Sequence, residues 1–400
     1  MDAYFASIEQ RDFPIYRGKP VIVCHTDDAN SLRGVVSAAS YEARPYGIKS
    51  GISVFEAKRK LKEAVYLVGN YEKYLYNTKK ILEICKRYSD IVEVFSVDEL
   101  FIDAEKTKNI FGGTIRIGLE IKNAIEKELG LSSSIGIGPN KLTAKMASEF
   151  HKPGGFTVIF PEDLPGILAP LPVDKLVGVG ERMKRHLDMI GVKTIGDLSK
   201  VSVDYLKKKF GVIGVALHYA SLGKDGARVY SRQAGLEIKS FGHSSALGKG
   251  ISDMDELSRL LLGLTEGVTR RMRKEKYYGR TITLRLCLAR MFSISRSKTG
   301  DFFTQETKDV FPVARELLKK EKSNIKRYPP TLIGVSVSNL VNVKDGYQLS
   351  IFDFIERKDR DLTKALDSIK DKFGERAIFR ASLGGWKRRY HSVPRLEIAK

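Results

Sequence analysis

Cysteine is scarce in this sequence, and long apolar runs are lacking. The 400 residues include only Cys24, Cys85 and Cys287, which lie far apart and show no metal-ligand spacing. Such sparse use is typical of a reducing, intracellular compartment rather than of a disulfide-stapled secreted domain. The six histidines form no HxH or HxxxH pair.

Signals for membrane insertion and for export are lacking as well. No segment approaches the roughly 18 consecutive apolar residues of a membrane-spanning helix. The N-terminus has no charged-then-apolar leader. The sequence therefore predicts a soluble, monomeric protein of the cytoplasm or nucleoid, with no membrane partner.

Acidic residues are too few to balance the basic ones. Lysine and arginine number 69 against 48 aspartates and glutamates, which gives a formal net charge of +21. This clustered excess favours a polyanionic partner, nucleic acid before anionic membrane, over a merely basic soluble protein. Hydrophobic residues make up 42% of the chain, which is enough for real cores.

Helix-like and strand-like segments alternate through the first 160 residues, as in an α+β domain. Residues 20–24 and 132–138 are typical of short strands, and residues 70–89 repeat apolar side chains at helical spacing. A proline-rich stretch at 162–175 marks a boundary. Beyond it we expect helices broken by glycines.

A second α+β unit is predicted after a polar, basic stretch at 225–239. Its expected order is β-α-β-β-α-β, with both helices on one face of the sheet. The strand at 280–290 alternates strictly, so that Thr281, Thr283 and Arg285 share the other face. This polar, partly basic face could lie along DNA or simply be solvated.

The segment LVGVGERMKRHLDMIGV, residues 176–192, resembles a helix-hairpin-helix. Gly178 and Gly180 would let main-chain N–H groups approach a DNA phosphate beside a helix N-terminus. An ordinary helical hairpin is the alternative, because Gly-x-Gly alone is weak evidence. Lys184 and the lysine run at 207–209 favour the DNA interpretation.

Two carboxylates, Asp98 and Glu99, interrupt the apolar, β-prone run FSVDELFID at 95–103. Adjacent residues of a flat strand point to opposite faces, so the pair reaches one site only at a bulge or turn. Buried carboxylates need a partner, and carboxylate oxygens suit Mg²⁺. Two such ions can assist phosphoryl transfer. Within an apolar hairpin of a basic protein, the pair predicts a metal site.

Cations that could hold a triphosphate occur in two other segments. SYEARPYG supplies Tyr41 and Arg44, whereas NKLTAKMASEFHKPGG supplies Lys141, Lys145 and Lys152. Arginine suits bidentate phosphate binding and lysine suits a point-charge contact. Taken singly, each could be a solvated surface charge.

Together these segments resemble the Y-family, translesion DNA polymerases of the DNA polymerase IV type. MDAYFASIEQ, SYEARPYGIKSG, FSVDELFID, SIGIGPNKLTAKMASEFHKPGG and VGVG occur in the family's order, and the match covers about residues 1 to 345. The resemblance implies error-prone, template-directed DNA synthesis past damaged bases. It also implies two Mg²⁺ ions as cofactors, and primer-template DNA and dNTP as partners.

The resemblance further implies a right-hand polymerase of α+β class. Its parts would be a palm (residues 1–3 and 70–160), fingers (4–69) and a helix-hairpin-helix thumb (161–226). A linker (227–238), a β-α-β-β-α-β little finger (239–346) and a tail (347–400) would follow.

Roles for single residues follow from the same resemblance. Asp98 and Glu99 match the metal-binding pair, and Phe5 matches the steric gate under the sugar. Triphosphate contacts would come from Tyr41, Arg44 and Lys152, and from main-chain groups of Tyr4 and Phe5. DNA contacts are expected at Gly178, Gly180, Lys184 and Arg285.

One feature departs from the family pattern D-x-D-x-[FY]-[FY]. The chain starts at the Met between the two aspartates, so Asp2 matches the second and the first metal ligand is missing. A misassigned start would explain this. A real truncation is the alternative, and it predicts a catalytically weak or inactive accessory protein that binds DNA and clamp.

A clamp-binding peptide is expected after the little finger. Gln348, Leu349, Ile351 and Phe352 resemble the Q-L-x-[LI]-F motif by which bacterial polymerases grip the sliding clamp. A linker that merely contains these residues is the alternative. Beyond it, residues 360–374 predict a helix that is packed, or bound to a partner, by one apolar face: Leu362, Leu366, Ile369 and Phe373.

Overall fold

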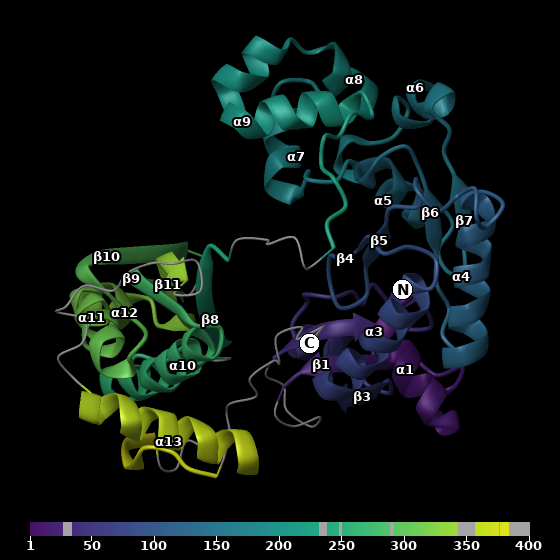
Figure 1. The fold of residues 1–400 in the computed structure, drawn as a ribbon. Helices are drawn as coiled ribbons and strands as arrows, with labels where there is room; N and C mark the ends of the chain where they lie inside the picture. The colour runs from purple at the N-terminus through teal and green to yellow at the C-terminus, as the bar shows by residue number, and fades with distance from the viewer. Residues whose placement is uncertain are drawn as a thin grey trace.

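The protein is described from a computed structural model, over residues 1–26, 34–231, 238–247, 250–288, 292–342, 357–375 and 377–383. In Figure 1 a mixed helix-and-strand body, a helical unit and a second mixed body follow one another along the chain. Within the described ranges, no helix has the length and apolarity that crossing a membrane requires.

A three-stranded sheet near the N-terminus lies between two hydrophobic cores. Ile22 and Cys24 face one core and Val21 and Val23 the other, which explains the continuous apolar run. The strand order is β2-β1-β3, with bounds β1 (Val21–His25), β2 (Val35–Ala39) and β3 (Val65–Val68). The helices beside it are α1 (Tyr4–Asp12), η1 (Pro14–Tyr16), η2 (Arg44–Tyr46) and α2 (Val54–Lys60).

The next segment carries the acidic pair. Its helices α3 and α4 share one core with α1, where Tyr4 and Ile8 join Ile81 and Ile121. Strands β4 and β5 form an antiparallel hairpin, and β6 pairs with β7 in parallel. The bounds are α3 (Tyr71–Lys86), β4 (Val92–Val94), β5 (Leu100–Ile102), α4 (Thr114–Leu129), β6 (Ile135–Ile137), α5 (Lys141–Phe150) and β7 (Phe156–Val158).

Short helices follow, and their core is continuous with α5. Leu142 and Met146 of α5 pack in one cluster with Leu187 and Leu206 of the helical unit. Gly211 kinks its last helix with a φ of 64°. The bounds are η3 (Pro161–Asp163), α6 (Leu164–Leu168), η4 (Val173–Lys175), α7 (Glu181–Asp188), α8 (Ile195–Lys200) and α9 (Val203–Ser221).

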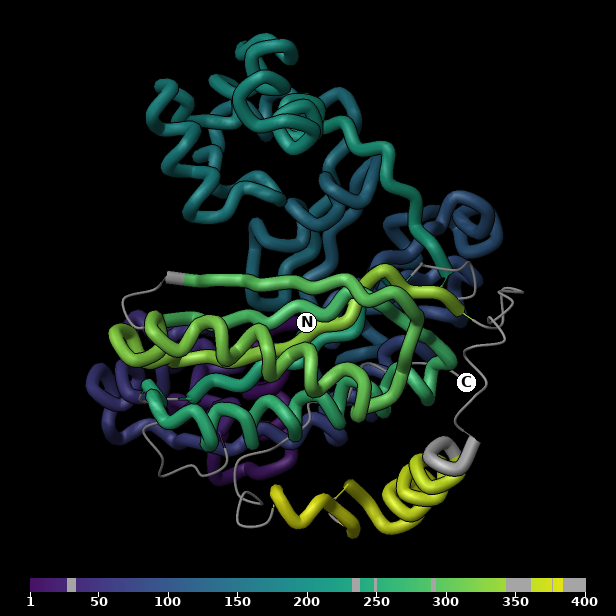
Figure 2. Tube along the Cα trace, turned by 90° about the vertical axis from the view of Figure 1, so that its left-hand side faces the viewer, coloured from purple at the N-terminus to yellow at the C-terminus, as the bar shows by residue number. Residues whose placement is uncertain are grey.

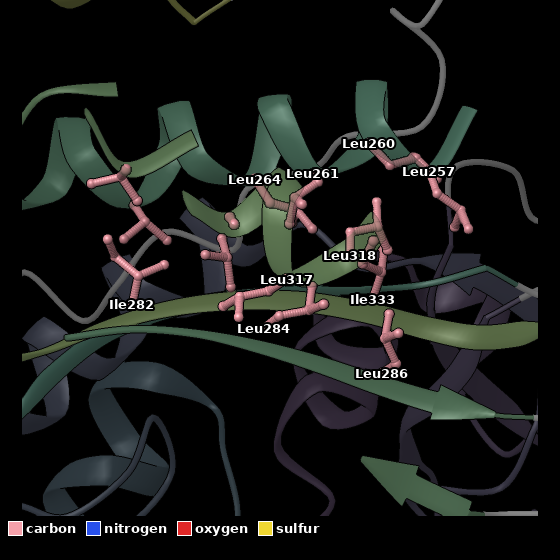
Figure 3. Close-up of a cluster of buried hydrophobic side chains, with 14 of the residues drawn as sticks. Leu257, Leu260, Leu261, Leu264, Ile282, Leu284, Leu286, Leu317, Leu318 and Ile333 are labelled. Carbon is pink, nitrogen blue, oxygen red and sulfur yellow. The ribbon is translucent and has the colours of Figure 1, made fainter. Parts of the chain in front are cut away.

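The predicted β-α-β-β-α-β order of the second mixed body is confirmed, with one short extra helix. Its antiparallel sheet has the order β10-β9-β11-β8, and the long helices cover one face (Figure 2). Leucines of α10 pack on Ile282, Leu284 and Leu286 of β9 (Figure 3). The bounds are β8 (Ser240–Ala246), α10 (Met254–Lys274), β9 (Tyr277–Leu288), β10 (Phe292–Thr304), α11 (Thr307–Lys320), α12 (Lys322–Arg327) and β11 (Pro330–Asn342).

The tail contains helix α13 (Arg357–Phe373) and the short turn η8 (Ala381–Leu383). Helix α13 contacts α10 through its polar side, since Asp367 lies 2.7 Å from Arg273 and Asp371 lies 2.7 Å from Arg270. The apolar stripe is not the packed side, because Phe373 is 67% exposed. Its alternative role in binding a partner stays a prediction.

Candidate active site

The hairpin of β4 and β5 presents Asp98 and Glu99 at its turn. The main-chain N–H groups of Phe95 and Ser96 both donate to the Glu99 carbonyl, at 3.0 and 3.1 Å. The two carboxylates therefore lie in a turn and not on a flat strand, which is the geometry that a shared site requires. The Ser96 hydroxyl donates to Asp98 Oδ1 at 2.7 Å.

Lys141 on helix α5 does not have the environment expected of a triphosphate ligand. The Lys141 Nζ lies 2.7 Å from both carboxylate oxygens of Glu93, and both side chains are largely buried. This ammonium is thus held in an ion pair with Glu93 and is not presented to a triphosphate. Lys145, one turn further along α5, forms an ion pair with Glu99. A bound cation at Glu99 would compete with that pair.

Asp2 is a buried carboxylate with a structural role. Its oxygens accept hydrogen bonds from the hydroxyls of Ser132 and Ser134, at 2.8 and 2.7 Å, and from the Gly154 N–H at 2.8 Å. Burial raises the pKa of Asp2, but these three donors outweigh it and hold the pKa below its ordinary value. The carboxylate ties the start of α1 to the strands β6 and β7.

We expect Asp2→Ala to lower the free energy of unfolding by about 3 kcal/mol, because it leaves buried donors unpaired. The effect should be present above the ordinary carboxyl pKa of about 4 and fade as the pH falls below it, since the folded pKa is depressed. Urea unfolding at several pH values measures this. Asp12→Ala is the control, and it should lower the free energy of unfolding by under about 1 kcal/mol. Equal losses of stability in the two variants would contradict the structural role of Asp2.

Tyr41, Arg44 and Lys152, which the sequence predicts as triphosphate contacts, lie in one region of the structure. The Arg44 guanidinium lies 4.0 Å from the Tyr41 ring centroid. Burial and the charge of Asp2 raise the pKa of Tyr41, and Arg44 and Lys152 oppose this, so all of these groups lie close together. Among the described residues, the buried Tyr41 hydroxyl has no hydrogen-bond partner.

The Met1 amino group links this cluster to the acidic pair. It donates to the Asp98 carbonyl oxygen at 2.8 Å. Burial lowers the pKa of this amine, and the charges of Asp98, Lys152, Asp2 and Glu99 all act on it. The Met1 amine therefore lies within reach of the charges of the acidic pair and of Lys152.

Phe5 is held in an aromatic frame. Its ring stacks on Tyr74 at 4.2 Å between centroids and meets Tyr71 edge-on at 5.8 Å. The Tyr4 hydroxyl donates to the Tyr74 carbonyl at 2.9 Å, which fixes α1 against α3. The sequence reasoning did not identify Tyr71 and Tyr74 as site residues. Their spacing of three places them on one face of α3.

The acidic pair offers hard oxygen ligands of the kind that Mg²⁺ prefers, and Mg²⁺ commonly shares its coordination sphere with oxygens of a phosphate. No group of three or more His, Cys, Asp or Glu side chains within the described ranges could hold a metal ion by itself. Asp98 and Glu99 therefore fit a metal that is shared with a triphosphate, and do not fit an all-protein site.

The Gly-x-Gly turn precedes α7. Gly178 has a φ of 97°, which favours glycine, and Gly180 precedes the helix without a side-chain cap. Lys184 Nζ lies 3.2 Å from Asp174 and is still partly exposed. These features are compatible with phosphate binding, and DNA contact at this turn stays a prediction.

The face of the β10-β9-β11-β8 sheet that lies opposite α10 and α11 is rich in hydroxyls. Thr281 bonds to Thr299 at 2.9 Å and Thr283 to Ser297 at 2.8 Å, across strands β9 and β10. Arg285 is exposed on the same face. The predicted clamp residues Gln348, Leu349, Ile351 and Phe352 lie outside the described residues.

Three family models match successive parts of the chain. Residues 1–149 match the impB/mucB/samB family, residues 174–225 match the thumb domain of DNA polymerase-iota, and residues 238–351 match the C-terminal domain of the impB/mucB/samB family.

Relatives that match nearly the whole chain, and solved structures, agree with these family models. DNA polymerase IV of Moorella thermoacetica is 37% identical over 381 residues, which are 95% of this chain and 94% of that protein. DNA polymerase IV of Bacillus velezensis is 32% identical, over 94% and 90% of the two chains. A solved Y-family DNA polymerase chimera, Dbh-Dpo4(243-245)-Dbh, is 25% identical with a TM-score of 0.75, and covers 85% of this chain and 97% of its own. The chain belongs to the Y family of DNA polymerases, of the DNA polymerase IV type.

Proposed function

We propose that this DNA-directed DNA polymerase copies templates past damaged bases at the site formed by the β4–β5 turn. One observation carries the assignment of the site: the Met1 amine bonds to the Asp98 carbonyl, and the charges of Glu99 and of Lys152, which also acts on Tyr41 beside Arg44, reach the same amine. Carboxylates for metal, cations for phosphate and an aromatic wall for the sugar are the parts that nucleotidyl transfer needs.

Each group of the chain has a distinct task in this mechanism. Arg44 and Lys152 would bind the triphosphate, and the unpartnered Tyr41 hydroxyl would donate a hydrogen bond to one of its oxygens. Phe5 would pack under the sugar. Asp98 and Glu99 would hold the metal ions, and two Mg²⁺ ions, when bound, stabilise the attacking and leaving oxygens.

A polymerase-like accessory protein without catalysis was the alternative. The comparisons do not support it, because relatives named DNA polymerase IV match nearly the whole chain. The retained site residues agree with this, since a purely DNA-binding protein would not need Asp98, Glu99 and the framed Phe5 together.

Primer extension tests the proposal. With Mg²⁺ and dNTP we expect extension past an abasic site, and none when the metal is chelated. A second form, preceded by a strand that ends in Asp, would place another carboxylate beside Asp98, because the Met1 nitrogen lies 2.8 Å from the Asp98 carbonyl. Higher activity of that form would support a shared third ligand. DNA binding without extension by either form would overturn the proposal.

We also propose that primer-template DNA is held by the thumb and the little finger. Support comes from the uncapped turn at Gly178 and Gly180, from Lys184 and Arg285, and from the net charge of +21. The proposed domain limits stay those predicted from the sequence. The sparse cysteines and the DNA substrate support a location in the cytoplasm.

A sliding clamp is the proposed protein partner. Replacing Gln348, Leu349 and Phe352 by alanine should remove the stimulation of synthesis by the clamp, because the peptide would lose its apolar and aromatic anchors. Basal synthesis should be unchanged. Primer extension with and without loaded clamp measures both, and an equal loss of the two activities would refute the assignment.

A further inference from the structure

Glu93 is a nearly buried carboxylate on β4 that the mechanism does not use. The residue is 8% exposed, and its two oxygens both lie 2.7 Å from the Lys141 Nζ. Its Oε2 also accepts a hydrogen bond from the main-chain N–H of Tyr230 at 3.0 Å. A buried charge needs such partners, so the three groups form one unit.

Tyr230 belongs to the linker between the thumb and the little finger. The chain leaves the thumb beside α5, where Asn140 donates to the Gly223 carbonyl at 2.7 Å and Asp225 accepts from the Leu142 N–H at 3.2 Å. Residues 224–231 then have no regular secondary structure, and Tyr230 contacts the palm within this stretch. The bond to Glu93 therefore ties the linker to the palm ten residues before the little-finger sheet begins at Ser240.

The same unit is continuous with the catalytic turn. Glu93 lies on the strand that leads into Asp98, and Lys141 lies one turn before Lys145, which pairs with Glu99. Rings of the hairpin fill the space between these pairs: Lys141 Nζ lies 5.0 Å from the Phe101 ring centroid, and Phe95 meets Phe101 edge-on. The contact between Glu93 and the linker is thus joined, through packed side chains, to the hairpin whose turn holds Asp98 and Glu99.

We propose that Glu93 is a positioning residue, whose carboxylate fixes the linker, and through it the little finger, relative to the catalytic turn. The inference rests on the proposed function, because it assumes that the little finger grips DNA. A fixed linker reduces the conformational freedom that the protein loses when palm, thumb and little finger hold one duplex. Glu93 would therefore strengthen primer-template binding without acting on the transferred nucleotide.

A backbone change separates this role from general stability. Tyr230→Pro removes the N–H that binds Glu93 and leaves the buried ion pair with Lys141 intact. Tyr230→Ala is the matched control, since it removes the side chain and keeps the N–H. As a second probe, the double variant Glu93→Gln with Lys141→Met removes both charges but keeps an acceptor for Tyr230, so it should behave like the control.

Two measurements decide the outcome. Spin labels can be attached at Lys79→Cys in the palm and at Lys319→Cys in the little finger, which are both exposed positions. The distribution of distances between the two labels should become broader in Tyr230→Pro and stay narrow in Tyr230→Ala. The Kd for primer-template should rise about tenfold in Tyr230→Pro alone, with the rate at saturating DNA unchanged. Equal distance distributions and equal Kd values for the two variants would overturn the proposal. The distances need no polymerase activity, so they remain decisive if the proposed function fails.

Discussion

Replacing Asp98 by alanine should abolish primer extension, by about a thousandfold or more, while primer-template binding stays within about threefold. The reason is the position of Asp98 in the turn between β4 and β5, where its carboxylate bonds to the Ser96 hydroxyl and does not support the core. Removing it deletes the proposed metal ligand without opening a cavity in the core. Single-turnover extension and fluorescence anisotropy with labelled DNA measure the two quantities.

Asp90→Ala is the matched control for this prediction. Asp90 is an exposed carboxylate just before the same hairpin, so its loss changes the charge near the site by the same amount. Its extension rate should stay close to that of the unaltered chain. Primer extension by Asp98→Ala would contradict the assignment of Asp98 as a metal ligand. An equal loss of extension in Asp98→Ala and Asp90→Ala would indicate a general electrostatic effect.

Local sequence was enough to predict the hairpin and its acidic pair. An apolar run with two adjacent carboxylates has few stable solutions, and a turn that exposes both is one of them. The order of elements in the little finger was predictable for a similar reason. Strict alternation at 280–290 and helical spacing around it leave one arrangement in which both helices bury their leucines on the sheet.

Partners that are distant in sequence could not be predicted in the same way. Asp2 bonds to Ser132, Ser134 and Gly154, more than 100 residues away, and no local pattern marks such contacts. Lys141 looked like a phosphate ligand because the sequence does not reveal that Glu93 lies opposite. A charge pattern shows which groups are available, whereas tertiary packing decides which of them are already paired.

Helix α13 shows the limit of an amphipathic pattern. The spacing of Leu362, Leu366, Ile369 and Phe373 indicates a helix with an apolar face, and the helix is present. The pattern favours burial of that face, yet ion pairs of Arg270 and Arg273 with Asp367 hold the opposite side. An amphipathic pattern thus predicts that a helix forms more securely than it predicts which side is covered.

Replacing Phe5 by alanine should raise the use of ribonucleotides relative to deoxyribonucleotides by about 10- to 200-fold, the range that a change in pocket shape supplies. The ring cannot move aside easily, because Tyr74 stacks on one face at 4.2 Å and Tyr71 meets it edge-on. A rigid ring under the sugar would clash with a 2′-hydroxyl, whereas alanine would leave room for it.

The ratio of the two kcat/KM values is the right quantity to measure, because it does not depend on the fraction of folded enzyme. Phe5 packs against the core, so the alanine variant also loses stability, and absolute rates alone would be ambiguous. Phe13→Ala provides the control: this aromatic ends the same helix, is 48% exposed and should leave the ratio unchanged. An unchanged ratio in Phe5→Ala would remove the gate assignment. A raised ratio in that variant alone would locate the sugar of the incoming nucleotide above Phe5, between the carboxylates of the turn and the cations that bind its phosphates.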